Sequence, residues 1–277
     1  MERATEKARE SIAPTEPSRG QEGLYLYCVA LSSEARTPEA IGEAIGIEGC
    51  EVLSVAWKDL CAAVHRCPAA PYQSKDAEVV ASWVTAQHRV VDAAWRHWGT
   101  VLPLTFNTII KGEPGRDARA CLLAWLGAER QVLKAKLETL AGKAEYGVQV
   151  FWNPQVVAKQ VAQSDAGIRA LEEEIKAKPP GIAYMYRQRL EALLKEKTEA
   201  TATAECTAIY SNIAQLVGEV HLEKPKTDPG QLQMLVNLSC LVSPAQLPRL
   251  ETELDRVSGM EGFSTRLIGP LPPYSFC

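Results

Sequence analysis

The sequence lacks several features that would assign it to a specialised class of protein. It has no run of eighteen or more apolar residues, so we expect no membrane-spanning helix. It has no basic excess, since 30 Lys and Arg stand against 34 Asp and Glu for a net charge of −4, which argues against a nucleic-acid partner. Its eight cysteines form no CxxC motif, which favours reduced, mostly buried thiols of a cytosolic protein.

The composition is that of an ordinary globular protein. Hydrophobic residues make up 46% and charged residues 23% of the 277 positions, close to the averages for folded domains. At about 150 residues per domain, this length favours two domains. Residues 1–20 mix charged residues with proline and contain no apolar segment, so we expect a disordered leader that is not a secretory signal.

The first half of the chain alternates strand and helix patterns. We expect a strand at Leu24–Ala30, a short helix from Thr37 to Gly46, a hairpin of Glu51–Trp57 and Leu60–Cys67, a helix at Asp76–Trp98 and a strand at Val101–Ile110. The short helix is expected to bury Ala40, Ile41, Ala44 and Ile45. The longer helix is expected to bury Val80, Val84, Gln87, Val91, Trp95 and Trp98. The order βαββαβ is typical of a ferredoxin-like sheet. A helix from Asp117 to Leu140, closed by Gly142, then bridges to the second half, so the first domain covers 21–142.

The second half predicts an α+β domain over 143–277 with a helical insertion. After a strand at Tyr146–Trp152, a heptad pattern predicts one helix with a seam at Val157, Val161, Ser164, Ile168, Leu171 and Ile175. Pro179-Pro180-Gly181 breaks it, and a longer helix follows from Tyr184 to Val220, whose seam runs through Tyr186, Leu190, Leu193 and Lys197, then Ala200, Ala204 and Ala208.

The two helices predict a long antiparallel, coiled-coil-like hairpin over 154–222. Beyond it the pattern gives a strand at Gln233–Leu241, a helix at Pro244–Val257, a strand at Phe263–Ile268 and a proline-rich tail over 269–277. The fold class is therefore α+β with two domains.

Candidate ligands for a metal or haem are few. Cys61, His65 and Cys67 share one face of a strand, but Cys61 and Cys67 are roughly 20 Å apart at about 3.3 Å per residue, so one Zn²⁺ cannot bind all three. His88 and His97 share a helix with tryptophans but stand nine positions apart, which favours a packed core helix over a haem pocket. His221 is expected in the last turn of the long helix, where a cation suits the helix dipole.

No catalytic motif is present. The sequence contains no GxSxG, HExxH, GxGxxG or GxxxxGK[ST] pattern, and the carboxylates of residues 172–174 fall on the outer face of the hairpin, where we expect a solvated surface. We therefore expect no enzyme, and we assign no catalytic, cofactor-binding or metal-binding residue and no cofactor.

The tail, GPLPPYSFC, combines stiff prolines with two aromatic residues. Tyr274 and Phe276 are able to bury considerable area, either against the body of the protein or against a partner. This ending, together with VLPLTFNT at Val101–Thr108 and GLYLYCVA at Gly23–Ala30, resembles the gas vesicle protein L/F family, whose members carry GPWPPYSF-like and LPLRFGT-like segments in the same order. The chain departs from these patterns at Thr105, Asn107 and Leu271.

The resemblance implies an accessory or minor structural protein needed to form gas vesicles. Its expected partners are the small, hydrophobic major shell protein and other gas vesicle accessory proteins, and its expected location is the cytoplasm, associated with the vesicle shell. The motif residues it marks as structural or partner contacts are Leu102, Pro103, Leu104, Phe106, Gly269, Pro270, Pro272, Pro273, Tyr274 and Phe276.

Two other functions stay open from the sequence. A ferredoxin-like enzyme that binds haem or a small molecule requires a pocket around His88, Trp95 and His97. A coiled-coil scaffold unrelated to vesicles requires an exposed hairpin seam that pairs with itself. The oligomeric state is open in either case.

Overall fold

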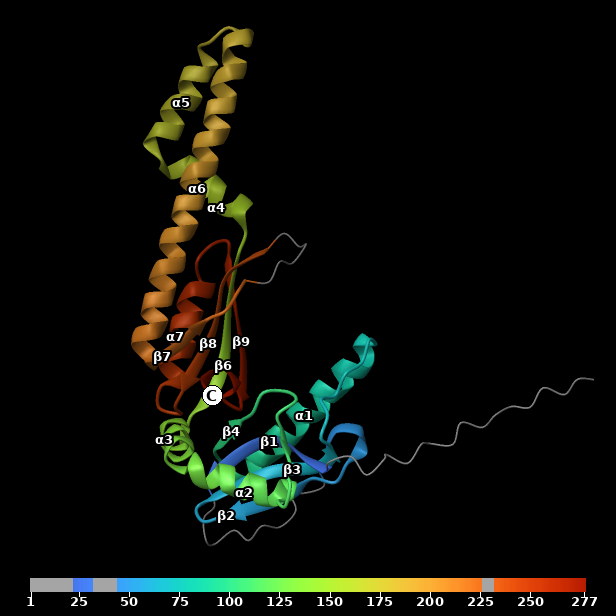
Figure 1. Cartoon of the computed structure of the whole chain (residues 1–277). Helices are drawn as coiled ribbons and strands as arrows, with labels where there is room; N and C mark the ends of the chain where they lie inside the picture. Colours follow the sequence, from blue (N-terminus) through green and yellow to red (C-terminus); the bar gives the residue numbers. More distant parts are fainter. Residues whose placement is uncertain (1–21, 32–43, 226–231) are drawn as a thin grey trace, which may run out of the picture.

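The computed structural model describes residues 22–31, 44–225 and 232–277 and contains two antiparallel sheets (Figure 1). The first sheet has the order β2-β3-β1-β4, and β5 also pairs with β1. Its strands are β1 (Glu22–Leu31), β2 (Leu53–Trp57), β3 (Leu60–Pro68), β4 (Val101–Pro103) and β5 (Ile109–Lys111), and a 3₁₀ turn, η1 (Ile47–Gly49), precedes β2. The sequence-based strand at Leu24–Ala30 and the 51–67 hairpin, with its turn at Lys58-Asp59, are confirmed.

Helices cover both faces of this sheet. Helix α1 (Ala77–Trp98) packs on one face, and α2 (Ala118–Ala128) with α3 (Arg130–Leu140) packs on the other. Strand β1 is buried along almost its whole length because it lies between these layers, as its continuous apolar run predicts. Asp76 caps α1 by accepting from the Glu78 N–H at 2.9 Å. The buried face of α1 is turned from the predicted one: Gln87 and Val91 are buried with Trp83, Val90 and Ala94, while Val80, Val84, Trp95 and Trp98 are only half-buried.

The second sheet has the order β7-β8-β6-β9. Its strands are β6 (Ala144–Trp152), β7 (Glu219–Leu222), β8 (Gln233–Val242) and β9 (Phe263–Leu271), and η2 (Tyr274–Phe276) follows β9. Helix α7 (Leu247–Ser258) and the C-terminal half of α6 (Pro180–Val217) cover one face. The predicted strands at 146–152, 233–241 and 263–268 are confirmed with small extensions, and the helix predicted at Pro244 begins at Leu247.

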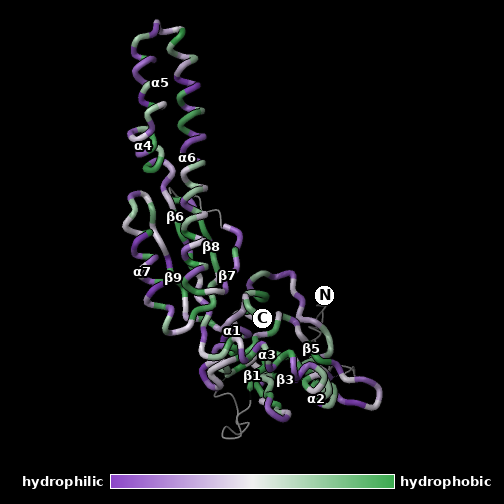
Figure 2. Tube along the Cα trace, turned by 90° about the vertical axis from the view of Figure 1, so that its left-hand side faces the viewer, coloured by the Kyte–Doolittle hydropathy of each residue, from purple (hydrophilic) through white to green (hydrophobic). Residues whose placement is uncertain are grey.

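The N-terminal half of α6 projects beyond the second sheet, together with α4 (Pro154–Ser164) and α5 (Ala166–Lys176) (Figure 1). We call α4, α5 and this half of α6 the helical hairpin. Hydrophobic and hydrophilic residues alternate along it (Figure 2). The buried positions Val157, Val161, Ile168 and Leu171 confirm much of the predicted seam. No described helix is long and apolar enough to cross a membrane.

Two elements predicted as continuous in the first half are divided. The strand predicted at Val101–Ile110 is two short strands, because the chain makes a turn at Thr105–Thr108, where Asn107 has a φ of 67°. The helix predicted at Asp117–Leu140 breaks at Glu129, whose ψ is 3°. The break lets both halves bury their leucines against the same face of the sheet.

The helical hairpin differs from the predicted helices at a break in the first helix and in the face that α6 buries. Asp165 divides the first helix, since its carboxylate accepts from the N–H groups of Gly167 and Ile168 at 2.8 and 3.0 Å and caps α5. Ser164 is consequently exposed rather than part of the seam. In α6 the small-residue positions at Ala200, Ala204 and Ala208, and Lys197 before them, are exposed, whereas Thr198 and Ala202 are buried.

The long helix also ends earlier than predicted. Gly218, with a φ of 86°, stops α6 after Val217. Val220 and His221 therefore lie in β7, an edge strand that the helical pattern concealed. His221 has no helix-dipole role.

Two predictions fall wholly or partly outside the described residues. The disordered leader at 1–20 lies outside them, as does most of the short helix predicted at 37–46. Of that helix, residues 44–46 are described and are not helical: Ala44 is half-buried against the core on the α1 side, whereas Ile45 forms an isolated bridge with Glu51 and is 66% exposed.

Candidate functional site at the junction of the two sheets

The loop between β4 and β5 is bound to β1 and α1 through buried hydrogen bonds. The Tyr25 hydroxyl donates to Gln87 Oε1 at 2.6 Å and accepts from the Asn107 N–H at 3.1 Å. Gln87 Nε2 then donates to the carbonyl oxygen of Leu104 at 2.9 Å. Burial raises the pKa of Tyr25 to about 12, so its hydroxyl keeps its proton at neutral pH. These bonds therefore tie the loop to β1 and α1.

Asn107 fixes this loop a second time. Its side chain accepts from the Tyr72 N–H at 2.8 Å and donates to the Tyr72 carbonyl oxygen at 3.1 Å. The family pattern has glycine at this position, and the φ of 67° explains the substitution, because Asn is among the few residues that tolerate left-handed backbone.

A buried histidine, His65, contacts both tyrosines that bind this loop, Tyr25 and Tyr72. His65 is fully buried in β3, and its Nε2 lies 2.9 Å from the Tyr72 hydroxyl. The ring of His65 stacks on Tyr25 with centroids 5.1 Å apart. Burial lowers the pKa of His65 to about 4, so the ring is neutral at pH 7.

The C-terminal tail runs from β9 into the junction between the two sheets (Figure 1). Tyr274 packs against the core on the α1 side of the first sheet, with its ring 4.9 Å from the ring of His88. Phe276 packs against the core on the other face and lies 4.7 Å from the ring of His221 in β7. The two aromatic residues of the tail thus contact both sheets.

Between these aromatic residues, Ser275 bonds to a buried carboxylate. Its N–H and its hydroxyl donate to the two oxygens of Glu145, each at 2.7 Å, and its hydroxyl lies 3.1 Å from Ser239 Oγ. Glu145 is 6% exposed, so these bonds compensate its lost hydration. The sequence reasoning missed Glu145; the available signal was its parity with Gly147 and Gln149, which gives β6 a second, less apolar face.

Backbone geometry brings the tail to this place. Gly269 has a φ of 143°, and a Cβ there would lie 2.8 Å from Tyr146 Cδ1 and 2.9 Å from the Glu145 carbonyl oxygen. Only glycine fits this combination of dihedral angle and close approach. The Gly269–Pro270 peptide bond is cis, and Pro272 and Pro273 are buried behind it.

The remaining motif residues lie around the same junction. Leu102 and Pro103 are buried in β4, which pairs with β1, while Leu104 and Phe106 are half-buried in the loop. Leu271, a departure from the family pattern, is 38% exposed at the end of β9. All three motifs therefore meet at one place in the fold.

A pocket of about 250 Å³ opens beside the tail, and we call it the corner pocket. Residues from α1, from the end of β4 and the loop after it, and from the tail line the pocket: Val84, Gln87, His88, Pro103, Leu104, Thr105, Phe106, Tyr274 and Cys277. Pockets for drug-sized ligands occupy about 300–1,000 Å³, so this one suits a single side chain better than a haem.

The candidate metal and haem residues make packing contacts. Cys61, His65 and Cys67 share one buried face, as predicted, and no group of three or more potential ligands occurs among the residues that the structure describes. His88 lies against Tyr274, whereas the His97 ring is 5.9 Å from that of Trp98.

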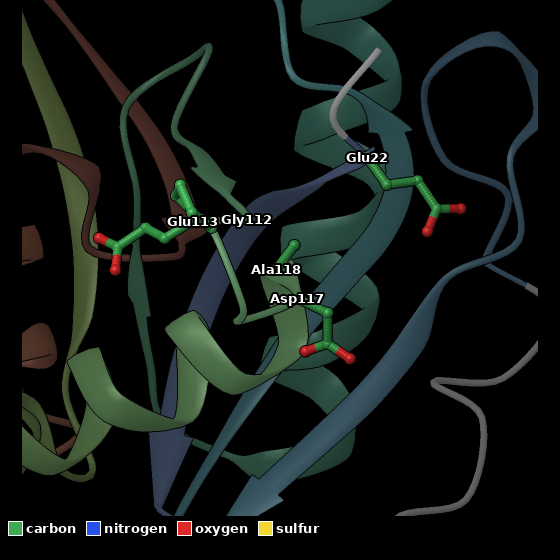
Figure 3. Close-up of a pocket in the computed structure, with 6 residues that line it drawn as sticks. Glu22, Gly112, Glu113, Asp117 and Ala118 are labelled. Atoms are coloured by element: carbon green, nitrogen blue, oxygen red, sulfur yellow. The ribbon is translucent and has the colours of Figure 1, made fainter. Parts of the chain in front are cut away.

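A second pocket, of about 370 Å³, is acidic but does not form a cation site. Glu22, Glu113 and Asp117 line it, and their carboxylates point in different directions (Figure 3). Asp117 already accepts from the Ala120 N–H at 2.6 Å as the cap of α2. The acidic character of the pocket is therefore explained by one helix-capping residue, Asp117, and two surface residues, Glu22 and Glu113.

Solved structures of similar architecture place this fold in a known class. The chain resembles the crystal structure of the gas vesicle protein GvpF from Anabaena sp. PCC7120 with a TM-score of 0.67 and 17% sequence identity, over 92% of this chain and 98% of the other. GvpF from Microcystis aeruginosa gives a TM-score of 0.58, also at 17% identity. At this identity the likeness shows the mixed α+β fold alone.

The sequence assigns the family directly. The family model for gas vesicle synthesis protein GvpL/GvpF matches residues 23–277, so the chain belongs to the GvpL/GvpF family. Among curated relatives, gas vesicle protein L1 of Halobacterium salinarum is 28% identical over 92% of this chain and 90% of its own length. Gas vesicle protein L2 of the same organism is 26% identical over 92% and 91%.

Proposed function

We propose that the chain is a non-enzymatic accessory or minor structural protein of gas vesicle formation, and that it binds the small, hydrophobic major shell protein during nucleation or assembly. The observation that carries this proposal is that polar residues of the family motifs form hydrogen bonds within the protein. The motif residues Tyr25, Asn107 and Ser275 use their polar groups in internal hydrogen bonds, which supports a structural rather than a catalytic role.

The helical hairpin supports the binding part of the proposal. It projects from the body and offers a long surface to a partner (Figure 1). An unassembled shell subunit exposes apolar area and strand edges, and an adaptor that covers them limits aggregation. The same reasoning extends to other gas vesicle accessory proteins as partners and to a location in the cytoplasm at the vesicle shell.

We also propose that 21–142 and 143–277 are two domains, the first of them ferredoxin-like. The strand order β2-β3-β1-β4 with antiparallel neighbours supports this assignment, and so does the position of α3 before β6. The packing of α4 and α5 along α6 supports a coiled-coil-like hairpin. Limited proteolysis that releases two stable fragments separated near Gly142 would test the division.

Co-expression with the shell protein tests the binding proposal. We expect the tagged chain to retain the shell protein through affinity purification. A matched variant replaces 166–196 by a short Gly-Ser linker. The side chains of Asp165 and Lys197 form an ion pair, with Oδ2 and Nζ 3.6 Å apart, so a short linker can connect the two ends of the excision. We expect it to retain less shell protein, and stable vesicles that form normally without the chain would contradict the proposal.

The haem-binding alternative has less support. The Tyr274 ring packs against the His88 ring at a tilt of 34°, and the corner pocket has about 250 Å³. An unchanged absorption spectrum after haem addition is the expected result. A self-pairing scaffold unrelated to vesicles would instead require the seam of the hairpin to be free, whereas Val157, Ile168 and Leu171 are buried within it.

A further inference from the structure

The second sheet ends in an edge strand whose outer side is unpaired. Strand β9 is the last strand of the order β7-β8-β6-β9, and no described residue pairs with it on the side away from β6 (Figure 1). It has nine residues, whereas β7 at the opposite edge has four. An unpaired edge presents a row of N–H and C=O groups to another strand, and short edge strands are one way in which proteins avoid such pairing. The long edge of this sheet is therefore β9.

The ladder between β6 and β9 shows which backbone groups point outwards. The Asn153 N–H donates to the Gly262 carbonyl oxygen at 2.7 Å, so these two residues form a hydrogen-bonded pair just before β9 begins. Such pairs alternate along an antiparallel ladder, which directs the N–H and C=O groups of every second residue of β9 toward β6: Ser264, Arg266 and Ile268. The N–H and C=O groups of Thr265 and Leu267 consequently point away from the sheet.

These outward groups define the chemistry of a ligand. Thr265 and Leu267 offer two donors and two acceptors that recur every two residues, or roughly 7 Å along the strand. A single side chain or a small molecule does not match this repeat, whereas the backbone of an extended chain does. The ligand that fits the edge is therefore a β-strand.

The open part of β9 lacks the features that usually oppose strand addition. From Phe263 to Ile268 the register is uninterrupted, and the sequence FSTRLI contains no proline or lysine. The one charged residue in this stretch, Arg266, lies over the ring of Phe151, 5.5 Å from its centroid, and so on the face of the sheet. Within β9, proline appears only at Pro270, so a length of roughly 20 Å is open to pairing.

The side chains beside this edge favour an apolar strand. Ile268 is 39% exposed on the face of the sheet away from α7, and Leu267 packs against the core on the α7 face. A strand added to β9 places its own side chains beside both, so apolar residues at those positions become buried. Phe263, at the start of β9, also packs against the core of the helical hairpin, so the edge begins at the base of the hairpin.

We infer that β9 binds an extended strand of the major shell protein, which becomes a fifth strand of the second sheet. This inference rests on the proposed function and names the surface that performs it. An unassembled shell subunit exposes strand edges, so pairing one of them with β9 satisfies the edge groups of both proteins at once.

Two proline variants test the pairing on matched edges. Thr265→Pro removes one outward N–H of β9 and leaves the bonds to β6 in place, and edge strands tolerate proline at such positions. Leu222→Pro is the control in β7: the Glu223 N–H donates to the Asn237 carbonyl oxygen at 2.8 Å, so the same alternation directs Leu222 outwards. In co-purification from co-expressing cells, we expect Thr265→Pro to retain about tenfold less shell protein and Leu222→Pro to retain as much as the unmodified chain.

A pair of lysine variants covers the case in which proline disturbs the fold. Ile268→Lys places a cation beside the β9 edge, and Leu222→Lys places one at the opposite edge, where the side chain of Leu222 is 69% exposed. Because lysine on an edge opposes strand addition, Ile268→Lys should also retain less shell protein, whereas Leu222→Lys should retain as much as the unmodified chain. Thermal unfolding of each variant verifies that the fold is kept.

Hydrogen exchange of the complex gives the direct readout. Bound shell protein should slow exchange in 263–268 by about tenfold or more and leave β7 unchanged. Full retention of shell protein by both β9 variants, or unchanged exchange in 263–268, would overturn the inference and leave the proposed function in place.

Two further outcomes separate this inference from its alternatives. An unmodified chain that retains no shell protein would overturn both the inference and the proposed function. Light scattering of the chain alone tests pairing between copies. If the chain associates with itself and Thr265→Pro abolishes this association without changing retention of shell protein, the edge binds a second copy, and the inference is overturned.

Discussion

The junction around the tail and the helical hairpin are built in different ways. The junction joins residues more than a hundred positions apart, such as Glu145 and Ser275, through buried hydrogen bonds and aromatic contacts. The hairpin is held by the packing of a few apolar residues along α4, α5 and α6, with exposed ion pairs such as Lys176–Glu173 on its surface. Exposed pairs of this kind contribute little to stability.

This difference indicates in which region a substitution should have only local effects. Because each junction residue serves several partners, a change there should affect both sheets at once. A change in the hairpin should stay local, since few contacts connect its outer half to the body.

Tyr274→Ala should have the largest effect. The substitution removes an aromatic ring that packs against the core of the first sheet and His88, and we expect the free energy of unfolding to fall by about 3 kcal/mol. Urea unfolding followed by tryptophan fluorescence measures it. A loss below about 1 kcal/mol would show that the tail is not part of the cooperative core.

Ile168→Ala tests whether a change in the helical hairpin stays local. Ile168 is fully buried between α5 and α6, and its truncation removes about 2–4 kcal/mol of packing free energy. We expect faster amide exchange only in 154–200, as measured by hydrogen-exchange mass spectrometry. Faster exchange in β1 or β3 would refute the locality of the hairpin.

Asn107→Ala tests the loop that carries the second motif. The variant loses both side-chain bonds to Tyr72 and places alanine in left-handed backbone, so we expect a loss of about 2 kcal/mol. Asn107→Gly loses the bonds but accepts the dihedral angle and should cost less. Equal losses in thermal unfolding of the two variants would rule out a role for backbone conformation.

His65 should give the smallest effect, a dependence of stability on pH. Its pKa is lowered by burial from 6.5 to about 4, so the unfolded chain binds more protons between these values. The stability it contributes is complete above about pH 6.5 and is lost as the pH falls toward 4. His65→Gln, compared with the unmodified chain in urea at pH 7, 6 and 5, should flatten this decline. An equal decrease in the free energy of unfolding with falling pH in both proteins would contradict this role of His65.

The sequence predicted most of the body correctly because its strands are apolar and its helices capped. Leu24–Ala30 reads as a buried strand, and Asp76 and Asp117 each cap the helix they were expected to begin. Local patterns of this kind depend on neighbouring residues only, so they are visible without the fold.

The errors arose where tertiary contacts or caps override periodicity. Asp165 breaks a heptad pattern that continues across it, and Gly218 ends a helix whose apolar spacing continues to Val220. The site itself was marked by family motifs, but its geometry was not predictable, since no local pattern pairs Glu145 with Ser275.

Hydrogen exchange of the unmodified chain and of Tyr274→Ala tests most directly the claim that the family motifs build the joint between the two sheets. We expect exchange to rise together in β1 and β4 of the first sheet and in β6 and β8 of the second, while the tip of the hairpin keeps its rates. A rise confined to η2 would contradict the claim, because it would show that the tail covers the junction without holding it together.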